Sequence, residues 1–180
     1  MNQRPKLIML GGFAGCGKTT IANKYVSETP LALNIDGDEI ITKLGQWRKN
    51  IHDAVASRLS LTSAMAEAHL RDGHDVILPF LLRDAGVAKH YEEVAHSAGA
   101  HFIEILLSVE KSEAIQRLLQ RGTWGEEGLP PITEEDIPKI EKLYDGMMEA
   151  VSYRPHMMCI ESKENDIEST YKDFLTAITQ

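Results

Sequence analysis

The chain has 180 residues, of which 43% are hydrophobic, and a formal net charge of −8 at pH 7. This length suits one domain, over residues 1–180, with a full hydrophobic core. No apolar run is long enough to cross a bilayer, Arg4-Pro5-Lys6 leads directly into an expected strand, and the acidic balance argues against a nucleic-acid surface. The two cysteines, Cys16 and Cys159, cannot form a disulfide framework, so we expect a cytoplasmic protein, monomeric or homodimeric, whose partner is a small molecule.

The first expected strand, residues 6–10, leads into a glycine-rich segment with the spacing G-x-x-x-x-G-K-[ST], and a helical pattern follows. Strand, turn and helix are the context in which this motif binds phosphate, because backbone N–H groups at the helix start point at the anion. We expect Lys18 to reach the terminal phosphates of ATP and the Thr19 hydroxyl to hold Mg²⁺. The alternative is a glycine-rich strand-to-helix turn without a ligand. The predicted nucleotide-binding residues of the loop are Gly12, Ala14, Gly15, Cys16, Gly17, Lys18, Thr19 and Thr20.

Short apolar runs and helical patterns alternate over the rest of the chain. Strands are expected at 31–35, 75–82, 102–107 and 157–160, although Pro79 is unusual inside a central strand. A helix is expected from Asn50 to about Arg71, and its apolar face carries Ile51, Val55, Leu59, Thr62 and Met65. Strands separated by helices imply a parallel sheet covered on both faces.

The loop and the element order resemble small P-loop kinases, the group that contains shikimate, gluconate, adenylylsulfate and nucleoside monophosphate kinases. The third strand, with Pro79 and the Arg83-Asp84 that follows, is also similar to tunicamycin-resistance type proteins. The resemblance implies an α/β P-loop NTPase fold: a three-layer sandwich whose five-stranded parallel sheet has the order 2-3-1-4-5. It also implies that the segment 122–137 is a short lid that closes to exclude water. Family lids usually supply a cation, but this segment has five acidic residues and no lysine or arginine. Arg154 is a candidate replacement, and a surface salt bridge is the simpler explanation for it.

Asp36-Gly37-Asp38 follows the second expected strand and resembles the corresponding Asp-Gly-Asp of adenylylsulfate kinases. The resemblance assigns Asp36 to the metal and Asp38 to the acceptor hydroxyl, which it would accept from or orient. The third strand offers no Walker B carboxylate, so the metal role falls on Asp36 or on water. The alternative is an Asp-Gly turn with a helix cap at Asp38.

Four arginines complete the predicted site. Arg58 follows the aspartate pair and is expected to line the acceptor pocket. Arg83 matches the arginine that faces the acceptor in adenylylsulfate kinases, and a surface pair with Asp84 is the alternative. Arg117 is similar to the base-stacking residue of adenylate kinase-like enzymes and Arg121 to their phosphate clamp; the alternative for both is a solvated helix end.

The sequence therefore predicts an ATP- and Mg²⁺-dependent kinase, a phosphotransferase that moves the γ-phosphate to a hydroxyl of a small molecule. Lys18, Asp38 and Arg121 are the predicted catalytic residues. The alternative is a nucleotide-binding regulatory or resistance protein that does not transfer phosphate to a small acceptor. The chain lacks the Asn-Lys-x-Asp motif of GTPase switches, and it is too short for the extra helical domain of an AAA+ motor.

Overall fold

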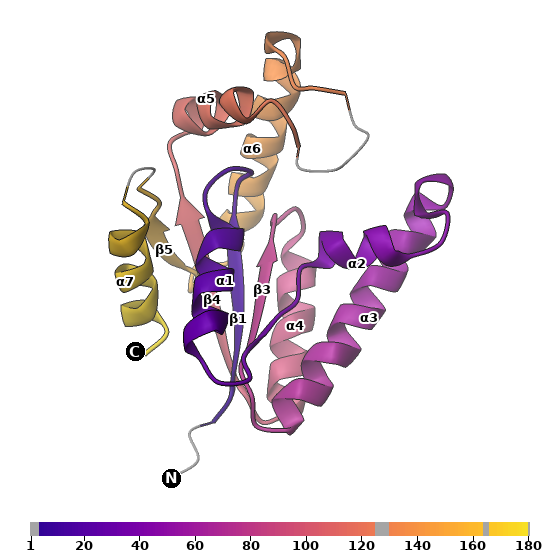
Figure 1. Ribbon diagram of the computed structural model, residues 1–180, viewed down its shortest axis with the longest axis vertical. Coiled ribbons are helices and arrows are strands. Elements are labelled where there is room, and N and C mark those ends of the chain that lie inside the picture. The colour runs from indigo at the N-terminus through magenta and orange to yellow at the C-terminus, as the bar shows by residue number, and fades with distance from the viewer. Residues whose placement is uncertain (1–3, 125–129, 164–165, 180) are drawn as a thin grey trace.

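A parallel sheet lies between two layers of helices in the computed structural model (Figure 1), which describes residues 4–124, 130–163 and 166–179. The five strands have the order β2-β3-β1-β4-β5, and every neighbouring pair is parallel. The predicted fold and strand order are therefore confirmed. The elements in chain order are β1 (Lys6–Gly12), α1 (Lys18–Glu28), β2 (Leu33–Asn34), α2 (Gly37–Lys43), η1 (Trp47–Lys49), α3 (Ile51–Arg71), β3 (Val76–Phe80), α4 (Ala85–Ser97), β4 (His101–Ser108), α5 (Lys111–Arg121), η2 (Glu134–Asp136), α6 (Ile137–Ser152), β5 (Met158–Glu161) and α7 (Ile167–Ala177).

The central strand β1 divides the core into two halves. Successive side chains of a strand point to opposite faces. Leu7 and Met9 belong to a cluster that includes residues of α3 and α4, whereas Ile8 and Leu10 belong to the cluster shared with α1, α5 and α7. All four side chains are fully buried, so β1 is anchored on both faces and the loop that follows it starts from a rigid base.

Strand β2 is shorter than the predicted run 31–35. Leu31 lies in the left-handed region with φ of 58° and is exposed, so the chain is still turning there. At the other end Asp36 already caps the short helix α2. The sequence indicated this helix only in the alternative interpretation, which placed a helix cap at Asp38. Two residues of pairing are enough to place the Asp36–Asp38 segment beside the end of β3.

Pro79 lies inside β3, next to Leu10 of β1. Proline cannot donate to a sheet ladder, which normally excludes it from central strands. Here β2 pairs with β3 only at Val76 and Ile77, so Pro79 lies beyond the end of β2 and takes no ladder bond from that neighbour.

The predicted inward face of α3 is wrong at three of its positions. Ile51, Val55 and Met65 are 43%, 41% and 39% exposed. Thr62, which belongs to the predicted face, is buried, and its hydroxyl is 2.6 Å from the hydroxyl of Tyr91 on α4. The N-terminal part of α3 extends with α2 beyond the sheet as an arm (Figure 1), which is why its apolar side chains stay exposed. The buried positions of α3 are Ala54, Thr62, Ala66 and Leu70.

The predicted lid, 122–137, is described at its two ends, while residues 125–129 lie outside the described part of the chain. The N–H of Ile132 donates to the carbonyl of Gly122 at 3.0 Å, so the two ends of the segment meet beside α5. A capping box between Thr133 and Asp136 then forms η2 and leads into α6.

Candidate nucleotide site

The glycine-rich loop lies between β1 and α1, packed against the end of β4. A side chain at Gly12 would place its Cβ 2.5 Å from Cys16 Sγ and 2.8 Å from the carbonyl oxygen of Leu107. Neither group can withdraw easily, because Cys16 and Leu107 are both buried. The first glycine of the motif is therefore required for the loop to close on itself over β4.

Lys18 turns its ammonium group into the loop. Its Nζ donates to the carbonyls of Gly12 at 2.9 Å and Phe13 at 2.8 Å. Thr19 and Thr20 follow on the first turn of α1, and both are exposed, as is Gly15 in the loop. A cation held at the mouth of the loop, beside the N-terminus of α1 and two exposed hydroxyls, can receive a phosphate chain.

Arg117 lies beside the loop, on the buried side of α5. Its Cβ would be 3.7 Å from a Cβ built at Gly15, and its guanidinium donates to the side chain and the carbonyl of Ser162, both at 3.2 Å. Glu113, one turn earlier, holds the same guanidinium at 2.5 Å. Arg117 is only 8% exposed, so the alternative of a solvated helix end is wrong for this residue. The stacking of Arg117 on a nucleotide base stays a prediction.

Ser162 and Glu113 are site residues that the sequence reasoning missed. Ser162 follows β5, and its hydroxyl donates to the carbonyl of Cys16 in the loop at 2.8 Å. The carboxyl ends of parallel strands meet at the edge of the sheet where the loop lies, but no motif in the sequence marks this serine.

The Asp36–Asp38 pair stands at the same edge of the sheet, after β2. Asp36 caps α2, accepting from the N–H of Asp38 at 2.9 Å, so the predicted cap lies two residues earlier than Asp38. Burial raises the pKa of the Asp36 carboxyl, and the neighbouring charges of Asp38 and Glu39 raise it further. Burial thus makes the ionised form of Asp36 less favourable, and a bound cation would offset this effect. The position of Asp36 therefore fits the predicted metal role.

Arg58 of α3 reaches the same segment and forms an ion pair with Asp38 at 3.4 Å. A Cβ at Gly37 would lie 2.9 Å from Arg58 Cδ, so glycine at this position leaves room for the arginine to lie against the backbone. The Asp-Gly-Asp segment thus contains a helix cap, as the alternative expected, and it also contacts Arg58. The contact places Arg58 beside Asp38, and the prediction that Arg58 lines an acceptor pocket stays a prediction.

The remaining arginines differ in their surroundings. Arg83 and Arg121 are exposed, Arg83 just before α4 and Arg121 at the end of α5. The carboxylate of Asp84 accepts from the N–H of Gly86 and caps α4. Arg154 binds Glu104 and Glu92, with closest distances of 2.5 and 2.9 Å. It is therefore a salt-bridged structural residue rather than a lid cation.

The predicted Mg²⁺ ligands are Thr19 and Asp36. Among the described residues no three histidine, cysteine, aspartate or glutamate side chains gather as a metal site. A Mg²⁺ ion beside a nucleotide keeps several waters and is held largely by phosphates, so it would need few protein ligands. Thr19 and Asp36 are the residues present that suit it.

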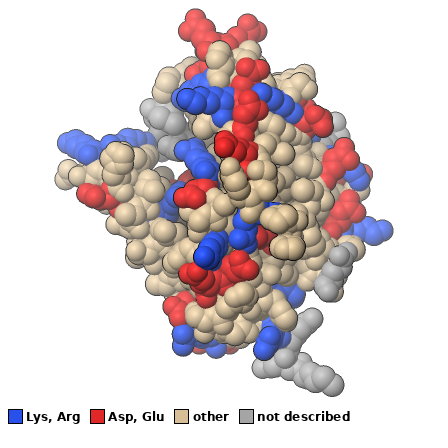
Figure 2. Space-filling model, turned by 180° about the vertical axis from the view of Figure 1, so that it is seen from behind, with Lys and Arg blue, Asp and Glu red and all other residues tan. Residues whose placement is uncertain are grey.

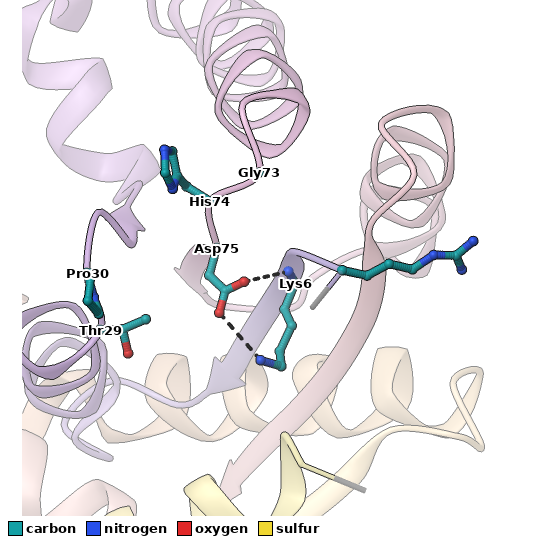
Figure 3. A pocket seen from close by; sticks show the side chains of 7 residues that line it. Lys6, Thr29, Pro30, Gly73, His74 and Asp75 are labelled. Carbon is teal, nitrogen blue, oxygen red and sulfur yellow. Dashed lines mark hydrogen bonds and ion pairs between the residues drawn. The ribbon is translucent and has the colours of Figure 1, made fainter. Parts of the chain in front are cut away.

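A separate hollow of about 170 Å³ lies where the strands begin, at the opposite edge of the sheet (Figure 3). Asp75 is its centre: it accepts from the N–H of Lys6 at 2.7 Å, pairs with the Lys6 ammonium at 3.5 Å, and accepts from the Tyr25 hydroxyl at 2.5 Å. Burial raises the pKa of Tyr25, so the hydroxyl keeps its proton. This network ties β1, β3 and α1 together and lies away from the loop.

Acidic and basic side chains alternate over the face of the molecule seen in Figure 2, and basic side chains mark the end of the arm. The exposed residues there are Lys43, Arg48 and Lys49. In the described part of the chain, no helix is both long enough and apolar enough to cross a membrane.

Comparisons with known proteins agree with the fold. The family model AAA_33, described as an AAA domain, matches residues 7–133. No curated protein matches the sequence.

Three solved structures are similar to this chain over most of its length. A chain of the Pnkp1/Rnl/Hen1 RNA repair complex is 15% identical with a TM-score of 0.67; 91% of the present chain is covered, but only 50% of that chain. APE1195 is 18% identical with a TM-score of 0.60, covering 98% and 96% of the two chains. A gluconokinase from Sinorhizobium meliloti 1021 is 13% identical with a TM-score of 0.60, covering 98% and 94%. At these identities the likeness concerns the fold alone.

Proposed function

Because the chain belongs to the AAA_33 family of AAA domains and has a P-loop kinase-like fold, we propose that it is an ATP-dependent phosphotransferase acting on a hydroxyl of a small molecule. The similar fold of the gluconokinase supports the proposal of kinase activity. The similar chain from the RNA repair complex means that the fold does not by itself determine the class of acceptor. The absence of a nucleic-acid partner and the cytoplasmic location stay predictions.

The observation that carries the proposal is the position of Lys18. Its ammonium is held by two loop carbonyls at 2.8 and 2.9 Å, at the N-terminus of α1, where a phosphate would exchange those weak contacts for charged ones. The triphosphate is therefore expected to lie along the loop with its terminal phosphate at Lys18.

The acceptor is expected on the side of α2 and α3, where Asp38 and Arg58 form their ion pair. The Asp38 carboxylate is 77% exposed, so it is accessible to a substrate hydroxyl. In the proposed reaction Asp38 orients that hydroxyl and accepts its proton, while Arg58 keeps the carboxylate in place. Mg²⁺, when bound by Thr19 and a water held by Asp36, supplies charge neutralisation between the phosphates.

Arg117 and Arg121 have different proposed parts. Arg117 is held by Ser162 and Glu113 with its Cβ beside Gly15, and its proposed stacking on the nucleotide base would use the small part of the side chain that is exposed. Arg121 ends α5 and is exposed, so it is free of a buried structural role and can reach a phosphate when the lid closes.

The test is a screen of small hydroxyl compounds for acceptor-dependent ADP release, with Lys18→Ala as the control for contaminating kinases. Release that requires one class of acceptor and is lost in Lys18→Ala supports the proposal. Tight ATP binding without release across sugars, polyols, amino alcohols and nucleosides favours the regulatory alternative. The lack of any cation in the segment 122–137 is the observation that keeps this alternative in view.

A further inference from the structure

We propose that Ser162 is a positioning residue for the phosphate loop: its hydroxyl holds the Cys16 carbonyl and thereby orients the N–H of Gly17 for phosphate. The inference rests on the proposed function, because it concerns the same nucleotide site. Ser162 is 8% exposed, and its Oγ lies 2.8 Å from the Cys16 carbonyl oxygen and 3.2 Å from a guanidinium nitrogen of Arg117. One buried hydroxyl thus joins the loop, β5 and α5.

The direction of these hydrogen bonds is determined by chemistry. A guanidinium has donors and no acceptor, so Arg117 donates to Ser162 Oγ and the hydroxyl proton is left for Cys16. Arg117 also donates to the Ser162 carbonyl, and Glu113 holds it from the other side. A neighbouring cation polarises the hydroxyl and strengthens it as a donor. The hydroxyl therefore has one orientation, in which its proton points at the Cys16 carbonyl of the loop.

The consequence for phosphate follows from the planar trans peptide. In such a unit the carbonyl of one residue and the N–H of the next point in opposite directions, and no peptide among the described residues is cis. Ser162 draws the Cys16 carbonyl toward the end of β5, so the N–H of Gly17 points away from β5. Gly17 is the residue before α1, where N–H groups meet the anion.

Ser162 is itself held rigidly. Its N–H donates to the carbonyl of Ser108 at 2.8 Å, which continues the pairing of β4 and β5 beyond the last residue of β5. The loop is thus fixed to the sheet at two separate points, through Gly12 against Leu107 and through Cys16 against Ser162. Loss of the second point should leave the fold in place but allow the Cys16–Gly17 peptide to rotate.

The experiment compares wild type, Ser162→Ala and Ser108→Ala by calorimetric titration with Mg²⁺·ATP and with Mg²⁺·tripolyphosphate, which has no base. Ser108 is the matched control, because its hydroxyl donates to the carbonyl of Ile160 at 3.2 Å and not to the loop. We expect Ser162→Ala to weaken both ligands by about tenfold, the scale of a lost buried hydrogen bond, and Ser108→Ala to change them less than about twofold. The Gly17 amide resonance should shift in Ser162→Ala and stay unchanged in Ser108→Ala.

Two results would overturn the inference. Unchanged tripolyphosphate binding in Ser162→Ala would mean that the hydroxyl does not position the loop, whatever happens to ATP. Equal weakening in Ser108→Ala would mean that both serines act only through stability. If Ser162→Ala does not fold, Ser162→Cys fills the site with a much weaker donor and is judged by the same criteria. Failure of wild type to bind either ligand would refute the proposed function itself, which is a distinguishable outcome.

Discussion

Asp36 should be stabilising as a helix cap and destabilising as a charge, and the two effects can be separated by two substitutions. Its carboxylate accepts from the N–H of Asp38 at 2.9 Å, a contact that asparagine can reproduce and alanine cannot. We expect Asp36→Ala to lose about 0.5–2 kcal/mol of unfolding free energy. For a domain of this size that is a fall in Tm of about 2–4 °C per kcal/mol. Asp36→Asn should keep the Tm of the wild type or exceed it at pH 7.

The pH dependence gives the sign of the charge effect. Because the pKa of Asp36 is raised in the folded protein, mainly by burial, the native state binds its proton more tightly than the unfolded state. The carboxyl therefore favours folding below its unfolded pKa of about 3.9 and loses this contribution as the pH rises through the folded pKa. Asp36→Asn has no such proton, so its stability relative to wild type should rise between about pH 4 and pH 7.

The assay is urea unfolding of the ligand-free wild type and both variants at several pH values, followed by the Mg²⁺ dependence of ADP release. Asp36→Asn should need about tenfold or more Mg²⁺ for half-maximal rate, the usual effect of losing a group that orients a metal ligand. If Asp36→Asn were as unstable as Asp36→Ala at pH 7 and had an unchanged Mg²⁺ requirement, the carboxylate would have a structural role and the metal assignment would be refuted.

Three further substitutions test separate parts of the account. Lys18→Ala should abolish most triphosphate binding in calorimetry and leave the ligand-free Tm nearly unchanged; a collapse of stability would make Lys18 structural. Asp38→Asn should lower the turnover rate by about 10²–10⁴-fold while ATP affinity stays close to that of wild type, and a small effect would leave the acceptor to other groups. Tyr25→Phe should lower the free energy of unfolding in urea by about 1–2 kcal/mol, because Asp75 loses the hydrogen bond from the Tyr25 hydroxyl. Weakened ATP binding in this variant would contradict our inference that the Asp75 network lies away from the phosphate loop.

The fold could be predicted from the sequence because its signals are local and consistent. The phosphate motif placed a glycine-rich turn between a buried strand and a helix, and alternating apolar runs specified the parallel sheet. Strand β2 and the inward face of α3 were less predictable. Leu31 adopts a left-handed conformation that no propensity indicates, and the packing of α3 follows small residues such as Ala66 that a search for large apolar side chains overlooks.

The site was predictable where a motif covers it and not where contacts join distant segments. Lys18 and Gly12 come from one short segment, so their spacing alone defines them. Ser162 lies 146 positions from Cys16, and only the strand order brings them together. The approach of Arg58 to Gly37 likewise depends on the angle between α2 and α3.

The most direct measurement follows the terminal phosphate itself. ATP labelled in its γ-phosphate would be incubated with Mg²⁺, pooled hydroxyl-bearing metabolites, and either wild type or Lys18→Ala, and the products separated by mass. The account predicts that wild type moves the label onto an organic hydroxyl and that Lys18→Ala does not. Label that stays in ATP, or that appears only as inorganic phosphate, would contradict a phosphotransferase.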